Sequence, residues 1–152
     1  MSQLRDPYGR PVTSLRISLT QRCNFECFFC HQEGEHDHGG EMTAGEVETI
    51  VRVASGLGVG KVKLTGGEPL LRGDIVEVVG RIKPHLEEVS MTTNASLLLG
   101  LACRLKDAGL DRVNVSLHTL DRATFKEITG VDQESKVRAG VEEAIRCGLN
   151  PV

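Results

Sequence analysis

Three cysteines lie close together in the run Cys23-Asn-Phe-Glu-Cys27-Phe-Phe-Cys30. This C-x3-C-x2-C spacing supplies three thiolates and no fourth. A closed structural zinc site needs four ligands, and an ordinary four-iron cluster needs four cysteines. Three thiolates on a cubane cluster leave one iron open to a small molecule. The run therefore predicts a [4Fe–4S] cluster with one position available for a ligand.

A zinc site is the alternative interpretation of this run. His31 could complete a Cys3His set, but the adjacent Cys30 and His31 would both have to turn toward one metal, which strains the loop. Phe28 and Phe29 lie between the thiolates and favour the cluster, because they can shield it from water and offer an apolar wall to a flat ring. The two histidines of residues 35–39 are of metal-binding type, but we expect them in a solvated loop.

A regular alternation of strand and helix patterns must position the cysteines. Apolar residues recur with helical spacing between short β-type runs, and Thr43-Ala-Gly-Glu46 has the capping-box pattern that opens a helix. Strands alternating with helices at this spacing predict an α/β fold with a parallel sheet. The expected strands cover residues 15–19, 61–65, 88–92 and 112–116, and residue 150 begins an expected fifth strand. The first expected helix begins after residue 43, and the others cover residues 75–82, 98–108, 121–129 and 135–147.

Each complete strand ends in small, polar or reactive residues. The first leads into the cysteines, and the others end in Thr65-Gly-Gly-Glu-Pro69, Thr92-Thr-Asn94 and Ser116-Leu-His118. These residues could simply form a glycine turn, cap the following helices or, for His118, make a structural hydrogen bond. Active sites of parallel α/β folds lie at the carboxyl ends of the strands, however. The pattern therefore predicts one site at that edge.

Two basic residues are candidates for binding an anion. Lys63 is two residues before Thr65 and so points to the same side of its strand. A lysine inside a barrel is costly unless an anion accompanies it. Arg10, in Asp6-Pro-Tyr-Gly-Arg10, precedes the first strand, and its alternative role is that of a surface arginine in a turn.

Composition limits the classes of function. The chain has 152 residues, 39% of them hydrophobic, and a net charge of −3, which suits one globular domain and does not favour nucleic acid or an anionic membrane as a partner. It has neither an apolar run of membrane-spanning length nor an N-terminal signal core, so we expect a cytoplasmic protein. Cys103 and Cys147 stand apart from the cluster, and we expect separate, small, buried or half-buried residues.

The cysteine run followed by Gly66-Gly67-Glu68 resembles the radical S-adenosylmethionine (SAM) superfamily. The runs at 6–10, 15–20, 65–72, 91–94 and 113–130 together resemble the GTP 3′,8-cyclases of molybdenum cofactor biosynthesis, in their archaeal form. The resemblance implies an incomplete radical SAM core over residues 1–152, a partial (β/α) TIM-type barrel that stops after about four βα units.

The resemblance also implies roles for individual residues. Three groups follow from it: cluster ligands Cys23, Cys27 and Cys30; SAM contacts Phe29, Gly67, Glu68, Asn94 and Ser116; and GTP contacts Arg10, Lys63 and Thr92.

The implied reaction converts GTP to (8S)-3′,8-cyclo-7,8-dihydroguanosine 5′-triphosphate through a 5′-deoxyadenosyl radical. Its partners would be GTP, a reductant for the cluster and a downstream cyclic pyranopterin monophosphate synthase, with no membrane and no nucleic acid. The family is substantially longer and carries a second cluster, so we expect this chain to bind a cluster and SAM without completing the cyclisation. We also expect an unpaired sheet edge to impair its solution behaviour. A radical SAM enzyme with another substrate and a non-catalytic metal-binding module are the alternatives.

Overall fold

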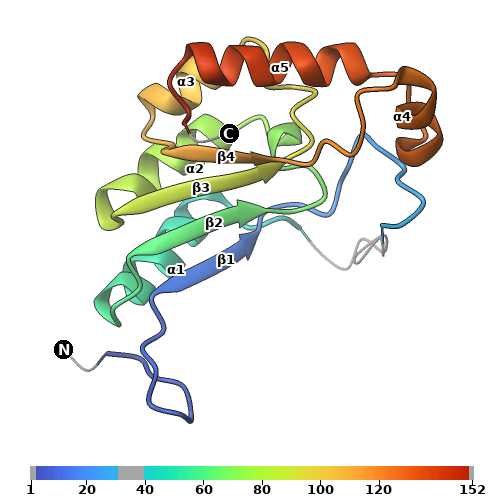
Figure 1. Cartoon of the computed structure of the whole chain (residues 1–152). Helices are drawn as coiled ribbons and strands as arrows, with labels where there is room; N and C mark the ends of the chain where they lie inside the picture. Colours follow the sequence, from blue (N-terminus) through green and yellow to red (C-terminus); the bar gives the residue numbers. More distant parts are fainter. Residues whose placement is uncertain (1–2, 31–39, 151–152) are drawn as a thin grey trace.

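The computed structural model describes residues 3–30 and 40–150 and has a four-stranded sheet at its centre (Figure 1). All three strand pairs are parallel, and the strands lie in chain order. This confirms the predicted α/β fold and the alternation of strands and helices. The strands are β1 (Ser14–Ser18), β2 (Lys61–Thr65), β3 (Glu88–Thr93) and β4 (Arg112–Val115).

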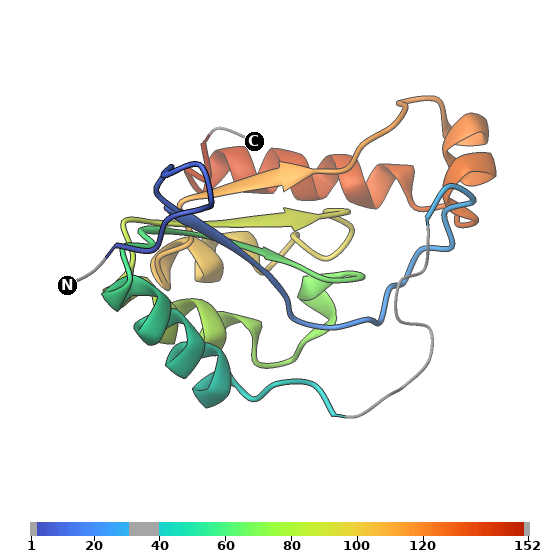
Figure 2. The same ribbon diagram turned by 90° about the horizontal axis from the view of Figure 1, so that it is seen from below.

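Helices α1, α2 and α3 connect the strands and cover one face of the sheet, whereas α4 lies beyond the carboxyl ends of the strands (Figure 1). Figure 2 shows the teal α1 and the green α2 side by side on that face, with the red α5 beyond β4. The helices are α1 (Ala44–Gly56), α2 (Ile75–Ile82), α3 (Ala102–Asp107), α4 (Arg122–Thr129) and α5 (Glu134–Arg146), with short 3₁₀ turns at η1 (Pro69–Leu71) and η2 (Lys83–His85). None of the described helices has the length and apolar character needed to cross a membrane.

Two predicted boundaries can be compared directly with the structure. The capping box is confirmed: the Glu46 amide donates to Thr43 Oγ1 at 3.2 Å, and the Thr43 amide donates to the Glu46 carboxylate at 2.8 Å. The helix expected from Leu98 starts later, because a turn closed by the Leu101 amide on the Leu98 carbonyl precedes it. The histidines at 31–39 lie outside the described residues. So does the predicted fifth strand, except for its first residue, Asn150.

The two faces of the sheet differ in chemistry. Side chains on the helix-covered face are apolar and buried, among them Leu64 and Met91, and burial of this kind supplies most of the stability of such a layer. The opposite face is polar: Arg16 lies next to Lys63 in the register, Lys63 next to Ser90, and Thr92 next to Asn114. A parallel sheet normally has apolar residues on both faces, so the polar face indicates a surface that contacts something other than a hydrophobic layer.

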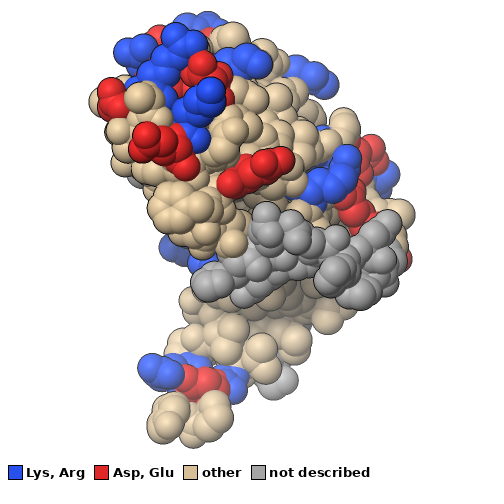
Figure 3. Space-filling model, turned by 90° about the vertical axis from the view of Figure 1, so that its right-hand side faces the viewer, with Lys and Arg blue, Asp and Glu red and all other residues tan. Residues whose placement is uncertain are grey.

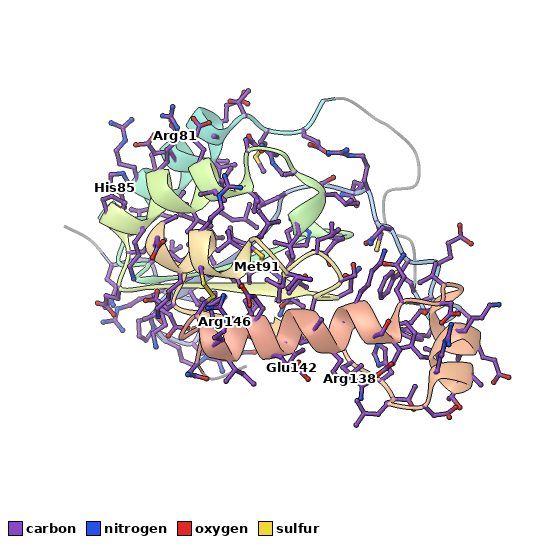
Figure 4. The ribbon with its side chains drawn as sticks, turned by 90° about the horizontal axis from the view of Figure 1, so that it is seen from above. Arg81, His85, Met91, Arg138, Glu142 and Arg146 are labelled. Carbon is purple, nitrogen blue, oxygen red and sulfur yellow. A yellow bond between two sulfur atoms is a disulfide. The ribbon has the colours of Figure 1, made fainter. Side chains whose placement is uncertain are left out.

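Cys103 and Cys147 form a disulfide, so the expectation that they stand apart is wrong (Figure 4). They are half-buried, as expected, but the start of α3 lies beside the end of α5, and their Cα atoms are 4.9 Å apart. The 44 residues that separate them in the sequence concealed this pairing. The three cysteines of the loop, Cys23, Cys27 and Cys30, are free.

A comparison of two helical glycines tests the packing of α5. A Cβ at Gly140 would overlap the carbonyl oxygen of Ala95, whereas a Cβ at Gly80 in α2 would meet nothing within 4 Å. We expect Gly140→Ala to lower the free energy of unfolding by about 1–3 kcal/mol. Gly80→Ala should raise it by about 0.5–1 kcal/mol through helix propensity. Urea unfolding of both variants measures the difference, and two variants of equal stability would contradict the close packing.

Candidate metal and cofactor site at the carboxyl ends of the strands

A cavity of about 190 Å³ lies where the strands end, and eight of the eleven predicted site residues line it. A second cavity, of about 360 Å³, lies near residues 55–60 and 84–87 and contains none of them. The prediction of one shared edge is therefore confirmed for the eight. They are Cys23, Cys27, Phe29, Cys30, Gly67, Thr92, Asn94 and Ser116; Arg10, Lys63 and Glu68 do not line the cavity.

The glycine pair after β2 lies against the start of the cysteine loop. The Gly67 amide donates to the Thr20 carbonyl at 2.8 Å, and the Glu68 amide donates to the Arg22 carbonyl at 2.8 Å. A Cβ at Gly66 would come within 2.6 Å of the Thr20 carbonyl oxygen, and one at Gly67 within 2.6 Å of the Gln21 carbonyl oxygen. Glycine is required because two backbone segments meet here without space for a side chain. The pair thus fixes the loop as well as lining the cavity.

Glu68 is fully buried and joins the ends of β2 and β3. Its carboxylate accepts from Thr93 Oγ1 at 2.7 Å, from the Asn94 amide at 2.7 Å and from the Leu70 amide at 3.0 Å. Burial raises the pKa of this carboxyl group, against the opposing effect of the three donors. With its oxygens bonded within the protein, Glu68 positions the residues that line the cavity.

An amide and hydroxyl network connects the cysteine loop to the end of β3. Asn94 Nδ2 donates to Asn24 Oδ1 at 2.9 Å, and Asn24 Nδ2 donates to Ser96 Oγ at 2.9 Å. Ser96 in turn donates to Asn94 Oδ1 through its hydroxyl at 2.7 Å and its amide at 3.0 Å. Because Asn24 follows Cys23 directly, this closed network restricts where the first thiol can lie.

Arg72 holds both ends of the segment that contains the cysteines. Its Nη1 donates to the Leu19 carbonyl at 3.1 Å and to the Met42 carbonyl at 2.8 Å. Asp74 accepts from the other side of the same guanidinium, at 2.7 and 2.9 Å. The Arg72 side chain is only 4% exposed. A buried cation with this bonding closes the base of the loop, with Glu41 nearby accepting from Thr20 and Arg22.

Helix α4 supports the loop from the other side. The Glu26 amide donates to the Thr129 carbonyl at 2.9 Å, and the Phe28 amide donates to the Ile128 carbonyl at 3.1 Å. The rings of Phe25 and Phe125 meet edge to face with centroids 5.8 Å apart. The sequence alone assigns α4 no role in the site, although Phe125 and Ile128, which are spaced to share one helix face, were an available sign.

The three thiols suit a cluster better than a single ion. Among the residues that the structure describes, the one set of three ligand atoms lying within 4.8 Å of one another is Cys103, Glu143 and Cys147. The sulfurs of the loop are therefore too widely spaced to share one ion, whereas a cubane gives each thiolate its own iron. Thiolate ligands select soft metals and iron–sulfur clusters.

Two of the loop thiols have pKa values that oppose ionisation in the absence of a metal. Burial raises the pKa of Cys23, and the negative charges of Glu68 and Cys30 raise it further. Burial likewise raises the pKa of Cys27, and the neighbouring Cys23 and Cys30 add to the effect. Metal binding displaces the protons, since the bound ligand is the thiolate. The chemistry of this donor set therefore fits the predicted [4Fe–4S] cluster.

The predicted basic residues lie in different places. Lys63 is half-buried on the polar face of the sheet, two residues before Thr65, which lines the cavity. Arg10 is exposed near the amino end of β1, with its Nε 2.6 Å from Asp6 Oδ2. Arg16, which the sequence reasoning missed, pairs with Lys63 in the register. The alternation Leu15-Arg16-Ile17 could have identified it, because an arginine opposite two apolar neighbours faces away from the core.

Charged side chains gather over part of the face that holds the carboxyl ends of the strands. Figure 3 looks at the carboxyl ends of the strands and shows lysines, arginines and acids gathered toward α4 and α5. Much of the visible surface beside the grey atoms is uncharged. His118 and Phe29 meet edge to face in the cavity wall, with ring centroids 4.8 Å apart. An apolar wall with few polar groups is typical of a pocket for a small organic ligand.

The carboxylates at the base of the loop should make stability depend on acid pH. The guanidinium of Arg72 lowers the pKa of Asp74 below its ordinary 3.8, and Arg22, followed by Thr20, lowers that of Glu41 below 4.5. A depressed native pKa contributes stability above the ordinary value, and that contribution is lost as the pH falls through the native value. We expect the urea midpoint to fall between pH 5 and 3, and to fall less in Asp74→Asn. Parallel pH profiles for the two proteins would contradict this assignment.

Comparison with known proteins agrees with the site. Residues 17–152 match the radical SAM superfamily. The chain is 58% identical over 150 residues to a probable GTP 3′,8-cyclase of Thermococcus kodakarensis and 51% identical over 150 residues to that of Sulfolobus acidocaldarius, covering 98% of this chain and 48% of each relative. It therefore spans about half the length of the curated relatives it matches.

A solved structure extends the comparison to three dimensions. Streptococcus suis SuiB bound to S-adenosylmethionine superposes with a TM-score of 0.75 at 26% identity, over 90% of this chain and 32% of SuiB. The superfamily match covers most of the chain, including the three thiols and the glycine pair that hold the cavity together. The chain belongs to the radical SAM superfamily.

Proposed function

We propose that residues 1–152 form the cluster-binding part of a radical SAM core and that the protein is a GTP 3′,8-cyclase of molybdenum cofactor biosynthesis. The observation that carries this proposal is the set of three free thiols gathered with Gly67, Thr92 and Asn94 at one cavity. The 58% identity to a probable GTP 3′,8-cyclase supports the choice of substrate.

Radical SAM proteins use a [4Fe–4S] cluster and SAM, and Cys23, Cys27 and Cys30 would hold the cluster here. The bound cluster supplies the electron that cleaves SAM reductively. Of the proposed SAM contacts, Phe29, Gly67, Asn94 and Ser116 line the cavity. Glu68 would contribute indirectly, because its carboxylate fixes Thr93 and Asn94. The apolar wall and the buried support of the loop would exclude water from the reacting groups.

GTP would lie over the polar face of the sheet. Thr92 faces the cavity, and Lys63 and Arg16 extend along the same face toward the amino ends of the strands. Two neighbouring cations suit a triphosphate, and arginine can bind phosphate oxygens in a fork. Arg10 lies beyond the amino end of β1 and bonds to Asp6, so we propose Arg16 as a further GTP contact in addition to Arg10.

The proposal includes partners that complete the pathway. An electron donor would reduce the cluster, and a cyclic pyranopterin monophosphate synthase would take up the product. We propose a cytoplasmic location. Neither a membrane nor a nucleic acid is among the proposed partners.

Product analysis under anaerobic conditions tests this function. Protein reconstituted with iron and sulfide is incubated with dithionite and SAM, with or without GTP, and 5′-deoxyadenosine and the cyclised nucleotide are measured by mass spectrometry. In the whole protein, of which residues 1–152 would be one part, we expect GTP to increase 5′-deoxyadenosine and to be consumed, whereas residues 1–152 alone should bind the cluster without forming the cyclised nucleotide. Lys63→Ala should weaken GTP binding, whereas Lys61→Ala, on the same face but paired with Glu88, serves as the matched control.

An enzyme acting on another substrate is the alternative that the fold itself supports. SuiB shares the fold with a TM-score of 0.75, so the architecture does not select a substrate. This alternative would be favoured if SAM were cleaved but GTP neither stimulated the cleavage nor was converted to a nucleotide product. Metal analysis showing one zinc ion and no sulfide would instead favour a non-catalytic metal-binding module.

A further inference from the structure

The disulfide between α3 and α5 lies beside an ion pair formed by Glu143 and Arg146. Arg146 Nη2 is 3.7 Å from Cys103 Sγ, and Glu143 Oε1 is 3.8 Å from Cys147 Sγ. Glu143 and Arg146 also bond to each other at 2.6 and 2.9 Å, which fixes both groups beside the sulfurs (Figure 4). The two sulfurs therefore differ in the charged atom that each approaches, Arg146 Nη2 for Cys103 and Glu143 Oε1 for Cys147, while the Glu143 carboxylate also lies within 4.8 Å of Cys103 Sγ.

This asymmetry distinguishes the two cysteines chemically. A guanidinium beside Cys103 favours its thiolate, and a carboxylate beside Cys147 disfavours the thiolate there. In thiol–disulfide exchange the sulfur with the lower pKa leaves more readily. The Arg146 side chain is 66% exposed and both cysteines are half-buried, so a small thiol can approach the pair.

We propose that Cys103 and Cys147 form a thiol–disulfide exchange site that accepts two electrons from a dithiol. One thiolate of the dithiol attacks Cys147 Sγ, the bond between the two sulfurs breaks, and Cys103 leaves as a thiolate beside Arg146. The second sulfur of the dithiol, after giving its proton to solvent, attacks the mixed disulfide. Cys147 then leaves and takes a proton, and the dithiol ends as a disulfide.

The cross-link fastens a helix that packs against the segment following β3. Gly140 of α5 lies against the carbonyl oxygen of Ala95 and the side chain of Leu98. The same segment carries Asn94 and Ser96, which hold Asn24 in the cysteine loop. Reduction would free the end of α5 from α3, and we expect faster amide hydrogen exchange at the last turn of α5 and in residues 94–98.

Peptide mapping tests the pairing. Trypsin cleaves after Arg104 and Arg146, so Cys103 and Cys147 fall in separate peptides, apart from the three cysteines of the loop. The full chain is purified without reductant, alkylated with N-ethylmaleimide and digested. We expect the two peptides to be joined by a disulfide, and dithiothreitol to release both for alkylation. Alkylation of both cysteines before reduction would overturn the proposal.

The same residues offer a competing interpretation. The ligand atoms of Cys103, Glu143 and Cys147 lie within 4.8 Å of one another, so the reduced form could hold a soft metal ion. Zinc is added to the reduced Cys23→Ala; Cys27→Ala; Cys30→Ala variant, which lacks the loop thiols. Zinc retained in equimolar amount, together with protection of both thiols from alkylation, would replace the exchange site with a metal site. Retention of no zinc is expected.

Alkylation kinetics test the roles of the neighbouring charges. The background for this test is Cys147→Ser, in which Cys103 is a free thiol. At pH 7, adding Arg146→Gln should slow the reaction of Cys103 with iodoacetamide about two- to fivefold, which is the effect on a rate expected from one partly exposed charge. Arg138→Gln, on the same helix and 60% exposed, is the matched control and should leave the rate unchanged. Equal rates in the two arginine variants would refute the assignment of Cys103. These readouts are independent of cluster loading and GTP turnover, so failure of the proposed function leaves them interpretable.

Discussion

Cys27→Ala is expected to remove nearly all bound iron and sulfide from the reconstituted protein. Cys27 lies in the cavity wall between Cys23 and Cys30, and the donor set has no spare thiol among the residues lining that cavity. Two thiolates cannot hold a cubane whose fourth iron is already open to a ligand. The intact loop should bind about four iron and four sulfide per chain. Metal analysis and the visible absorbance of the cluster measure the change.

A double variant provides the control for this experiment. Cys103→Ala; Cys147→Ala removes the same type of residue from the disulfide, away from the cavity, without leaving an unpaired thiol. It should retain the iron and sulfide content of the unmodified chain. A full cluster in Cys27→Ala, or loss of the cluster only in the double variant, would show that the loop is not the metal site.

Arg72→Met is expected to lower the free energy of unfolding by about 2–4 kcal/mol, chiefly because two carbonyl groups lose the donor on a buried guanidinium. The change leaves the carboxylate of Asp74 without its cation and the carbonyl groups of Leu19 and Met42 without their donor. Methionine matches the length of the arginine stem, so the loss should come mainly from polar groups. Urea unfolding monitored by circular dichroism measures the effect.

Arg81→Met is the matched control for this substitution. Arg81 also bonds two carboxylates, those of Glu77 and Glu48, but its side chain is 46% exposed on α2 (Figure 4). Exposed ion pairs contribute little, so the change should stay within about 1 kcal/mol. Limited proteolysis would add a local readout, with faster cleavage between residues 20 and 42 in Arg72→Met alone. Similar losses in the two variants would contradict a special role for the buried guanidinium.

The sequence predicted the strands and most of the site because both depend on local pattern. Period-two apolar runs located the strands, and the polar residues following them lie at one edge in any parallel sheet. Cys23, Gly67 and Asn94 could therefore be grouped from the order of strands and helices alone.

Other parts depend on contacts between distant segments, which pattern does not encode. The glycine pair suggested space for a ligand, but it is also packed against residues 20–22. Arg72 appeared as one basic residue after a turn, and only the fold brings Leu19 and Met42 to it. The pairing of Cys103 with Cys147 required knowing that α3 and α5 are neighbours.

The polar face of the sheet has a consequence for the rate at which ligands arrive. Its strand residues include four cations, Arg16, Lys61, Lys63 and Arg112, and one acid, Glu88, in a chain whose net charge is −3. Such a local surplus creates a potential that draws anions toward one face while the rest of the molecule repels them. Diffusional encounter with a polyanion should therefore slow as salt shortens the Debye length, which is about 8 Å at physiological ionic strength. The same arrangement would discriminate against neutral nucleosides at the stage of first approach.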